Sequence, residues 1–255
     1  MNYTVVYYRF GDTVFCIETP GAMKQDPRFE AFAVPPTEHP TYILTVKTIT
    51  VEMCELSEWP AYVTREGNHL QVYLNTELIP NITVANLLVV SHADLLLPEQ
   101  GGFLLHASYI HHNGEAILFS APCETGKSTQ AHFWAQERGS TVVNEDRVLV
   151  FSRDGEFYAA GIWATGSAGV TKNITAPIRA VVLLGQGPEN RVTVPPVPLR
   201  LQRLMSQSTY DPSDPVSYRD VLLLACSLID HVKVISYDCI NHPSSVRDLE
   251  AYLYE

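Results

Sequence analysis

The first hundred residues alternate apolar and polar positions with the two-residue period of half-buried strands. Runs rich in β-branched and aromatic residues are separated by polar turns, and the prolines fall between the runs, where they interrupt no strand pairing. The pattern predicts a small antiparallel sheet, mostly a meander, within a β-rich N-terminal domain of residues 1–100. Its expected strands cover residues 3–10, 13–17, 41–51, 61–64 and 69–74.

From residue 101 onward, apolar runs typical of buried strands alternate with segments that have helical spacing. Asn113-Gly114 indicates a tight hairpin, and Gly139 indicates the end of a helix that begins at Lys127. The pattern predicts an α/β (α+β) domain of residues 101–255, with a mixed sheet and flanking helices. Strands are expected at 103–112, 115–120, 141–143, 147–151, 179–184 and 231–239, and helices at 127–138, 199–208, 218–231 and from Ser244 or Ser245 to Tyr254.

Composition narrows the class of protein. The chain has 255 residues, of which 46% are apolar and 18% charged, so most of it is expected to fold. Its 17 basic and 28 acidic residues give a net charge of −11, which argues against nucleic acid as a partner. No run of apolar residues is long enough to span a membrane, and the first residues lack the pattern of a signal peptide. We therefore expect a cytoplasmic protein without a membrane partner.

The cysteines do not form a recognisable framework. The five are widely scattered and include no C-x-x-C pair, so neither a disulfide framework nor a zinc site is expected. Free thiols of this kind fit a reducing compartment.

The most informative segment reads Ser-Ala-Pro-Cys-Glu-Thr-Gly-Lys-Ser-Thr over residues 120–129. It fits the phosphate-binding pattern [AG]-x4-G-K-[ST], and it lies between an apolar strand and a helix. Successive backbone N–H groups then point into one hollow, and the helix N-terminus favours an anion there. The residues expected to bind the phosphates of a nucleotide are Ala121, Pro122, Cys123, Glu124, Thr125, Gly126, Lys127, Ser128 and Thr129.

Individual loop residues have distinct expected roles. Gly126 allows close approach of the backbone, Lys127 reaches the terminal phosphates, and the Ser128 hydroxyl is a ligand for Mg²⁺. Two positions depart from the usual pattern: Ala121 replaces the first glycine, and Glu124 stands where glycine is common because the backbone there is permissive. The Glu124 carboxylate must point away from a bound anion.

A second cluster follows about 18 residues after Lys127, in Asn144-Glu145-Asp146-Arg147-Val148. Two adjacent carboxylates at the end of an apolar strand are compatible with a solvated turn. Beside a phosphate-binding loop they also fit phosphoryl transfer, which needs a carboxylate for the metal and a group that orients or deprotonates the nucleophile.

These segments together resemble a known family. Leu104-Leu-His106-Ala-Ser108, the loop at 121–128 and the Glu145-Asp146-Arg147-Val148 run are similar to the catalytic domain of HPr kinase/phosphorylase and its shorter relatives, which include kinases of amino acids and of ribosomal peptides. The resemblance covers residues 103–185 well and the remainder to 255 loosely. The N-terminal third matches only in general layout.

The resemblance implies roles for individual residues. His106 falls where the family has a histidine that supports the catalytic acid, Glu145 falls on the proposed base for the acceptor hydroxyl, and Asp146 falls near the metal. Lys127 and Ser128 keep the roles given above. Glu145 is one carbon longer than the family's aspartate, so the acceptor geometry differs, and the long loop that handles a protein substrate has no clear counterpart here.

Other polar positions carry weaker expectations. His111 and His112 lie beside the hairpin turn and are expected in solvent. His132, one turn into the helix after the loop, is expected to be a packing residue. The glycine-rich stretch at 161–169 is equally compatible with a plain loop and with contacts to the acceptor.

The resemblance and the motifs together lead to the expected function. We expect an ATP- and Mg²⁺-dependent kinase that transfers a phosphoryl group to a hydroxyl on a peptide or small molecule. Serine is the favoured acceptor, and peptide natural-product maturation is the favoured setting. The main alternative is a catalytically silent nucleotide-binding module with a regulatory or scaffolding role, which Glu124 and Glu145 favour. A phosphate-binding hydrolase is a second alternative. The oligomeric state is left open, a homo-oligomer included.

Overall fold

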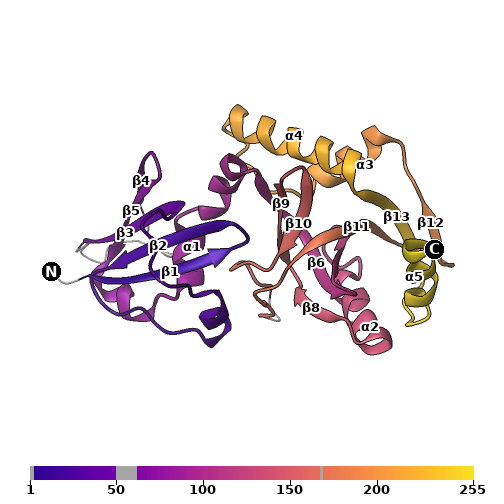
Figure 1. Ribbon diagram of the computed structural model, residues 1–255, viewed down its shortest axis with the longest axis horizontal. Coiled ribbons are helices and arrows are strands. Elements are labelled where there is room, and N and C mark those ends of the chain that lie inside the picture. Colours follow the sequence, from indigo (N-terminus) through magenta and orange to yellow (C-terminus); the bar gives the residue numbers. More distant parts are fainter. Residues whose placement is uncertain (1–2, 50–61, 167–168) are drawn as a thin grey trace. The chain divides into compact units, whose positions relative to one another are not determined.

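The computed structural model describes residues 3–49, 62–166 and 169–255. The chain divides into two compact units, residues 1–94 and 95–255, which are coloured indigo to purple and magenta to yellow in Figure 1. Cys54 and the segment around Pro60 lie outside the described residues.

The first unit contains one sheet with the strand order β1-β2-β3-β5-β4 among the described residues. One short α-helix, α1, begins at Val84 behind a Thr83 capping box, and the remaining helices are 3₁₀ segments. The bounds are β1 (Thr4–Phe10), β2 (Thr13–Thr19), η1 (Pro27–Phe32), β3 (Tyr42–Ile49), β4 (Tyr62–Glu66), β5 (His69–Asn75), η2 (Thr76–Asn81), α1 (Val84–Val90) and η3 (Ala93–Gln100), the last of which crosses the division between the units.

The expected antiparallel meander is wrong for this sheet. β1–β2 and β4–β5 are antiparallel hairpins, but β2 pairs with β3, and β3 with β5, in parallel. Parallel pairing needs a long crossover, which the segment between β2 and β3 supplies with η1. Phe29 and Phe32 of η1 are buried, so this crossover packs as part of the core.

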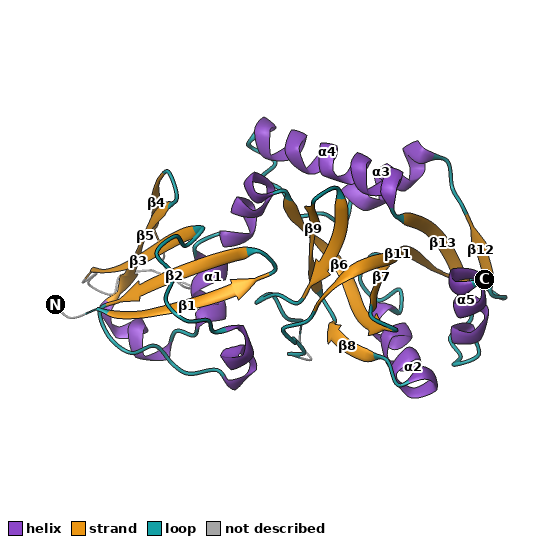
Figure 2. Ribbon diagram, in the orientation of Figure 1, coloured by secondary structure: helices purple, strands orange, loops and turns teal. Residues whose placement is uncertain are grey.

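The second unit contains the larger sheet, with the order β10-β9-β6-β7-β11-β13-β12 and with β8 paired to β6. It mixes parallel and antiparallel pairs and carries helices, so the expected α/β class is confirmed (Figure 2). The sequence did not predict β10 or β12. The bounds are β6 (Gly102–His112), β7 (Glu115–Ser120), α2 (Lys127–Arg138), β8 (Thr141–Asn144), β9 (Arg147–Arg153), β10 (Glu156–Ala160), β11 (Thr175–Gln186), β12 (Arg191–Thr193), α3 (Val197–Met205), α4 (Pro215–His231), β13 (Lys233–Cys239) and α5 (Ser245–Tyr254).

Both faces of the central strands are buried. Along β7, Ala116 and Leu118 belong to one core cluster, whereas Ile117 and Phe119 belong to the other. The first cluster includes residues of α3 and α4, and the second includes residues of α2 and α5. Helices therefore cover both faces of the sheet, and the edge at which β7 ends is left for a site.

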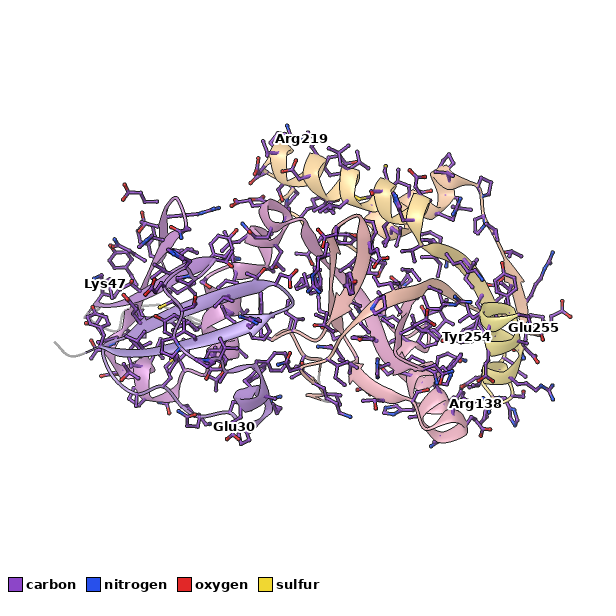
Figure 3. The ribbon with its side chains drawn as sticks, viewed as in Figure 1. Glu30, Lys47, Arg138, Arg219, Tyr254 and Glu255 are labelled. Atoms are coloured by element: carbon purple, nitrogen blue, oxygen red, sulfur yellow. The ribbon has the colours of Figure 1, made fainter. Side chains whose placement is uncertain are left out.

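Helices α2 and α5 are joined by an ion pair between Arg138 and Glu250, with an N–O distance of 2.6 Å; Figure 3 labels Arg138 on α2 and Tyr254 on α5. The expectation that His112 lies in solvent is wrong. Its side chain is buried beneath these helices, with its ring 5.2 Å from the Trp134 ring and 5.8 Å from the Tyr254 ring. His112 is the last residue of β6, and the aromatic side chains of α2 and α5 pack against its ring.

Candidate functional site

The loop between β7 and α2 has the geometry of an anion-binding turn. β7 ends at Ser120 and α2 begins at Lys127, as the sequence predicted. Gly126 has φ 105° and Glu124 has φ 64°, so the backbone is left-handed at both positions. No side chain caps the N-terminus of α2, which leaves its first backbone N–H groups available to an anion.

The Lys127 side chain lies inside this loop. Its ammonium donates hydrogen bonds to the backbone oxygens of Ala121 at 2.9 Å and Pro122 at 3.1 Å. Lys127 is buried, and burial lowers its pKa from the ordinary value, while the carboxylate of Asp146 acts in the opposite direction. The ammonium therefore fixes the loop from within and lies close to the acidic cluster.

The acidic turn between β8 and β9 is held by Asn144, whose side chain is fully buried. Its Oδ1 accepts hydrogen bonds from the backbone N–H groups of Asp146 and Arg147, at 3.1 and 3.3 Å. Ser108 Oγ donates to the backbone oxygen of Glu145, and the Ala107 N–H donates to that of Asp146. The two carboxylates thus stand on a backbone fixed by neighbouring strands.

The two acids have different surroundings. The Asp146 side chain is 39% exposed, and its Oδ1 lies 3.6 Å from His106 Nε2. The Glu145 side chain is only 5% exposed, and its Oε1 lies 2.9 Å from His132 Nε2 on α2. No hydrogen bond of good geometry reaches that oxygen from the described residues.

Two expectations change as a result. His106, expected beside Glu145, instead contacts Asp146. His132, expected to be a packing residue, is an exposed side chain that faces Glu145. The first difference follows from the turn, which points successive side chains in different directions, so that only the second acid faces β6.

The imidazole of His106 is oriented by Gln207. Gln207 Nε2 donates to the Ser206 oxygens, which leaves Gln207 Oε1 to accept from His106 Nδ1 at 3.1 Å. The other ring nitrogen, Nε2, then faces Asp146 without a proton. Burial and the nearby Lys127 lower the pKa of His106 below its ordinary value, which favours this neutral ring.

The glycine-rich stretch packs beside the acidic turn. A Cβ on Gly166 would meet the Asp146 Cβ at 3.0 Å, and a Cβ on Gly161 would meet the backbone oxygen of Lys172 at 2.0 Å. Asn144 Nδ2 donates to the backbone oxygens of Ile162 and Ala164. Gly166 therefore allows this segment to lie close to Asp146, and Gly161 allows it to lie close to the backbone at Lys172.

The residues fit a Mg²⁺ ion that is shared with a nucleotide. No group of three or more His, Cys, Asp or Glu side chains in the described ranges could hold a metal ion. Mg²⁺ commonly binds through one or two carboxylates, waters and substrate phosphates rather than in an all-protein cage. Ser128 begins the helix beside Lys127, and the half-exposed Asp146 carboxylate offers the oxygen such an ion needs.

Of the expected catalytic and metal-binding residues, His106 and Asp146 are in contact, and the charge of Lys127 is near enough to lower the pKa of His106. Glu145 faces away toward α2. Sequence reasoning missed Asn144, Gln207 and His132. An asparagine directly before paired acids signals an Asx turn and could have been recognised, whereas Gln207 reaches His106 from 101 positions away with no sequence signal.

Comparisons with known proteins give a distant similarity. No family model and no curated protein matches the chain. A solved structure of the HPr(Ser) kinase/phosphatase from Coxiella burnetii is similar, with a TM-score of 0.33 and 13% identity, over 60% of this chain and 99% of that one. Within the described ranges, no helix combines the length and apolar character needed to cross a membrane.

Proposed function

We propose that the second unit binds a nucleoside triphosphate, ATP in the first instance, at the loop of residues 121–129 and transfers its terminal phosphoryl group to a hydroxyl. The observation that supports this most is that Lys127, Asp146 and His106 gather beside the end of β7. The Lys127 ammonium bonds the residue after β7, the next strand carries His106, and His106 Nε2 lies 3.6 Å from Asp146 Oδ1. Phosphoryl transfer depends mainly on positioning and on charge stabilisation, and these residues supply both.

Each residue has a separate role in this proposal. The backbone N–H groups around Thr125–Ser128 bind phosphate oxygens, and the Lys127 ammonium exchanges its loop carbonyls for the terminal phosphates. Ser128 and Asp146 hold Mg²⁺, which would neutralise charge that develops on the transferred group.

The acceptor proton needs a base close to Asp146. His106 Nε2 and Asp146 Oδ1 are two acceptors facing one another at 3.6 Å, an arrangement that suits a hydroxyl proton or a cation between them. We therefore assign the base to His106, oriented by Gln207. Glu145, the base suggested by sequence, is buried and faces His132 of α2.

The proposed acceptor is the hydroxyl of serine, free or within a peptide, and peptide maturation remains the favoured setting. A silent nucleotide-binding module is the competing proposal. Its support is that Glu145, which falls on the family's base position, is 5% exposed, so that transfer depends on His106 taking over as the base.

A transfer assay separates these two proposals. The protein is incubated with Mg·ATP labelled at the γ-phosphate and with L-serine, L-threonine or a library of serine-containing peptides, and label in each acceptor is measured. We expect Mg²⁺-dependent labelling of a serine hydroxyl. Tight binding of Mg·ATP with no transfer to any acceptor and no hydrolysis would support the silent module.

Three substitutions then test the roles. Asp146→Asn should weaken Mg²⁺-dependent binding and transfer together. His106→Gln should keep Mg·ATP binding and slow transfer by about 10²–10⁴, the usual contribution of a general base. His111→Gln, on the same strand, is the matched control. If Glu145→Gln slows transfer to this extent and His106→Gln does not, the base is Glu145.

A further inference from the structure

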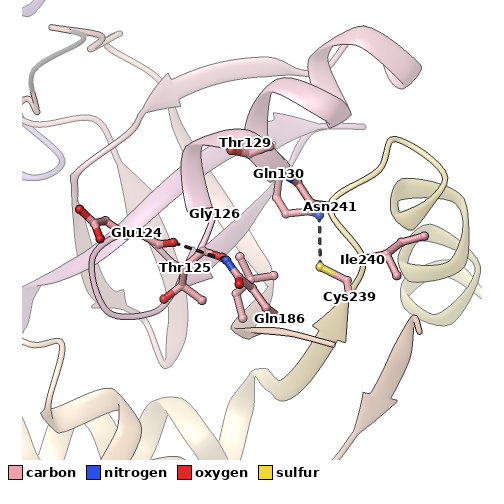
Figure 4. Close-up of a pocket in the computed structure, with 10 residues that line it drawn as sticks. Glu124, Thr125, Gly126, Thr129, Gln130, Gln186, Cys239, Ile240 and Asn241 are labelled. Carbon is pink, nitrogen blue, oxygen red and sulfur yellow. Dashed lines mark hydrogen bonds between the residues drawn. The ribbon is translucent and has the colours of Figure 1, made fainter. Parts of the chain in front are cut away.

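A small hollow lies on the opposite side of the phosphate-binding loop from the acidic turn. Its volume is ≈ 140 Å³. β7, β11 and β13 run parallel, so Ser120, Gln186 and Cys239 end at the same edge of the sheet. Ligands of open α/β sheets bind outside such carboxyl ends. The hollow is lined by Glu124, Thr125, Gly126, Thr129, Gln130, Leu184, Gln186, Cys239, Ile240 and Asn241 (Figure 4).

The lining has an apolar floor and a polar rim. Leu184 and Cys239 are buried, and Ile240 is partly buried beside them. The side-chain amides of Gln186 and Asn241 are exposed at the mouth. Gln130 is 3% exposed, and its amide nitrogen is held by Cys239 Sγ at 3.2 Å and Ser245 Oγ at 3.0 Å. This wall is therefore fixed before any ligand arrives.

The charge of the lining excludes a second phosphate site. Among the described residues that line the hollow there is no Lys, Arg or His, and Glu124 adds a carboxylate. A neutral, flat group with polar edges fits better. The volume corresponds to about five waters at about 30 Å³ each, below the roughly 300 Å³ of a pocket for a whole ligand.

The rim can exchange its present contacts for those of a ligand. Gln186 Nε2 donates to the backbone oxygens of Glu124 at 3.5 Å and Thr125 at 3.3 Å, which are long and solvent-exposed bonds. Thr129, which follows Ser128 on α2, also lines the hollow. A nucleotide whose phosphates occupy the loop would thus extend directly past Thr129 into it.

We propose that this hollow is the nucleobase subsite, in which Leu184 and Ile240 contact the ring and the amides of Gln186 and Asn241 bind its polar edge. This inference rests on the proposed nucleotide binding at the loop. It adds a binding site for the base of the nucleotide, which the phosphate-binding loop itself would not contact. The protein then prefers a nucleoside triphosphate to a bare triphosphate.

Calorimetric titration of the full chain with Mg·ATP and with Mg·tripolyphosphate tests the subsite. The wild type should bind Mg·ATP about tenfold or more tightly than Mg·tripolyphosphate, the effect of one or two additional hydrogen bonds and ring contacts. Ile240→Trp, which fills the hollow, should remove this preference and keep the affinity for tripolyphosphate. Asn241→Ala should reduce the preference about threefold, and Gln136→Ala, an exposed glutamine on α2, should leave it unchanged.

The outcomes separate this inference from the proposed function. Equal wild-type affinity for both ligands, or an ATP preference that survives in both Ile240→Trp and Asn241→Ala, overturns the subsite and leaves triphosphate binding at the loop intact. Binding of neither ligand by the wild type overturns both proposals. Asn241→Ala changes an exposed side chain, so the test stands even if Ile240→Trp does not fold.

Discussion

Glu124 is unfavourable in the phosphate-binding loop for two reasons, its backbone conformation and its charge. Its backbone is left-handed, with φ 64°, and its side chain is exposed beside the proposed phosphate site. The left-handed conformation costs a non-glycine residue about 1–2 kcal/mol. Its carboxylate also carries the wrong charge for an anion-binding loop, so the backbone lowers the stability of the fold and the side chain acts against ligand binding.

Two substitutions separate these effects. Glu124→Gly should raise the affinity for Mg·ATP about two- to fivefold, because an exposed like charge contributes up to about 1 kcal/mol. Glu124→Gln should give a similar gain in affinity, whereas only Glu124→Gly should also raise the free energy of unfolding. Calorimetry and urea denaturation measure the two quantities. Unchanged affinity in both variants would mean that this carboxylate does not face the bound anion.

The sequence predicted one part of the candidate site and not the other. The phosphate-binding motif predicted Gly126, Lys127 and Ser128, because a loop that enters a helix in this way needs these residue types at this spacing. The partners of the two acids depend on which way each side chain leaves a turn, and that direction depends on the hydrogen bonds of the buried Asn144. Gln207 reaches the site through the chain after α3, which no local pattern reveals.

At the scale of elements, the packing of α2 and α5 over β6 encloses His112. Its Nδ1 lies 3.0 Å from Ser140 Oγ, and its Nε2 lies 3.7 Å from Glu250 Oε1. Burial lowers the pKa of His112 from the ordinary 6.5, and Arg138 and His111 add to this, while Glu250 and Glu115 oppose it. Asn113 Nδ2 also contacts the ring.

This lowered pKa makes stability depend on pH. The unfolded chain protonates His112 more readily than the folded chain, so the contribution is fully present above pH 6.5 and is lost as pH falls through the lower folded pKa. The free energy of unfolding should therefore decline as the pH falls below the ordinary 6.5, and His112→Gln should flatten the decline. His69→Gln, an exposed histidine on β5, is the control. An equal slope in His112→Gln and the wild type would contradict this account.

Local sequence signals predicted the positions of helices and strands better than they predicted which strands pair and in which direction. α2 begins and ends where Gly126 and Gly139, both left-handed, interrupt the helix. The direction of pairing between β2, β3 and β5 depends instead on how a crossover packs, and alternation of apolar residues is the same for parallel and antiparallel neighbours. β12 has three residues and gives no period to detect.

At the scale of the whole molecule, the candidate site belongs to one unit. Every residue assigned to phosphate, metal, base and proton transfer lies between residues 95 and 255. A fragment of residues 93–255, which keeps η3 whole, should therefore bind Mg·ATP within about twofold of the full chain. Calorimetry on both proteins measures this. A folded fragment with a large loss of affinity would show that the first unit contributes to binding.

The proposed function depends on whether Lys127 binds a nucleoside triphosphate at the loop of residues 121–129. The most direct test is calorimetric titration of Mg·ATP into the wild type and into Lys127→Ala, with Lys233→Ala, at the opposite end of β13, as the matched control. A charged hydrogen bond of this kind contributes roughly 1.5–3 kcal/mol, so we predict an affinity loss of about ten- to hundredfold in Lys127→Ala and none in Lys233→Ala. Equal affinity in Lys127→Ala and the wild type would contradict the account.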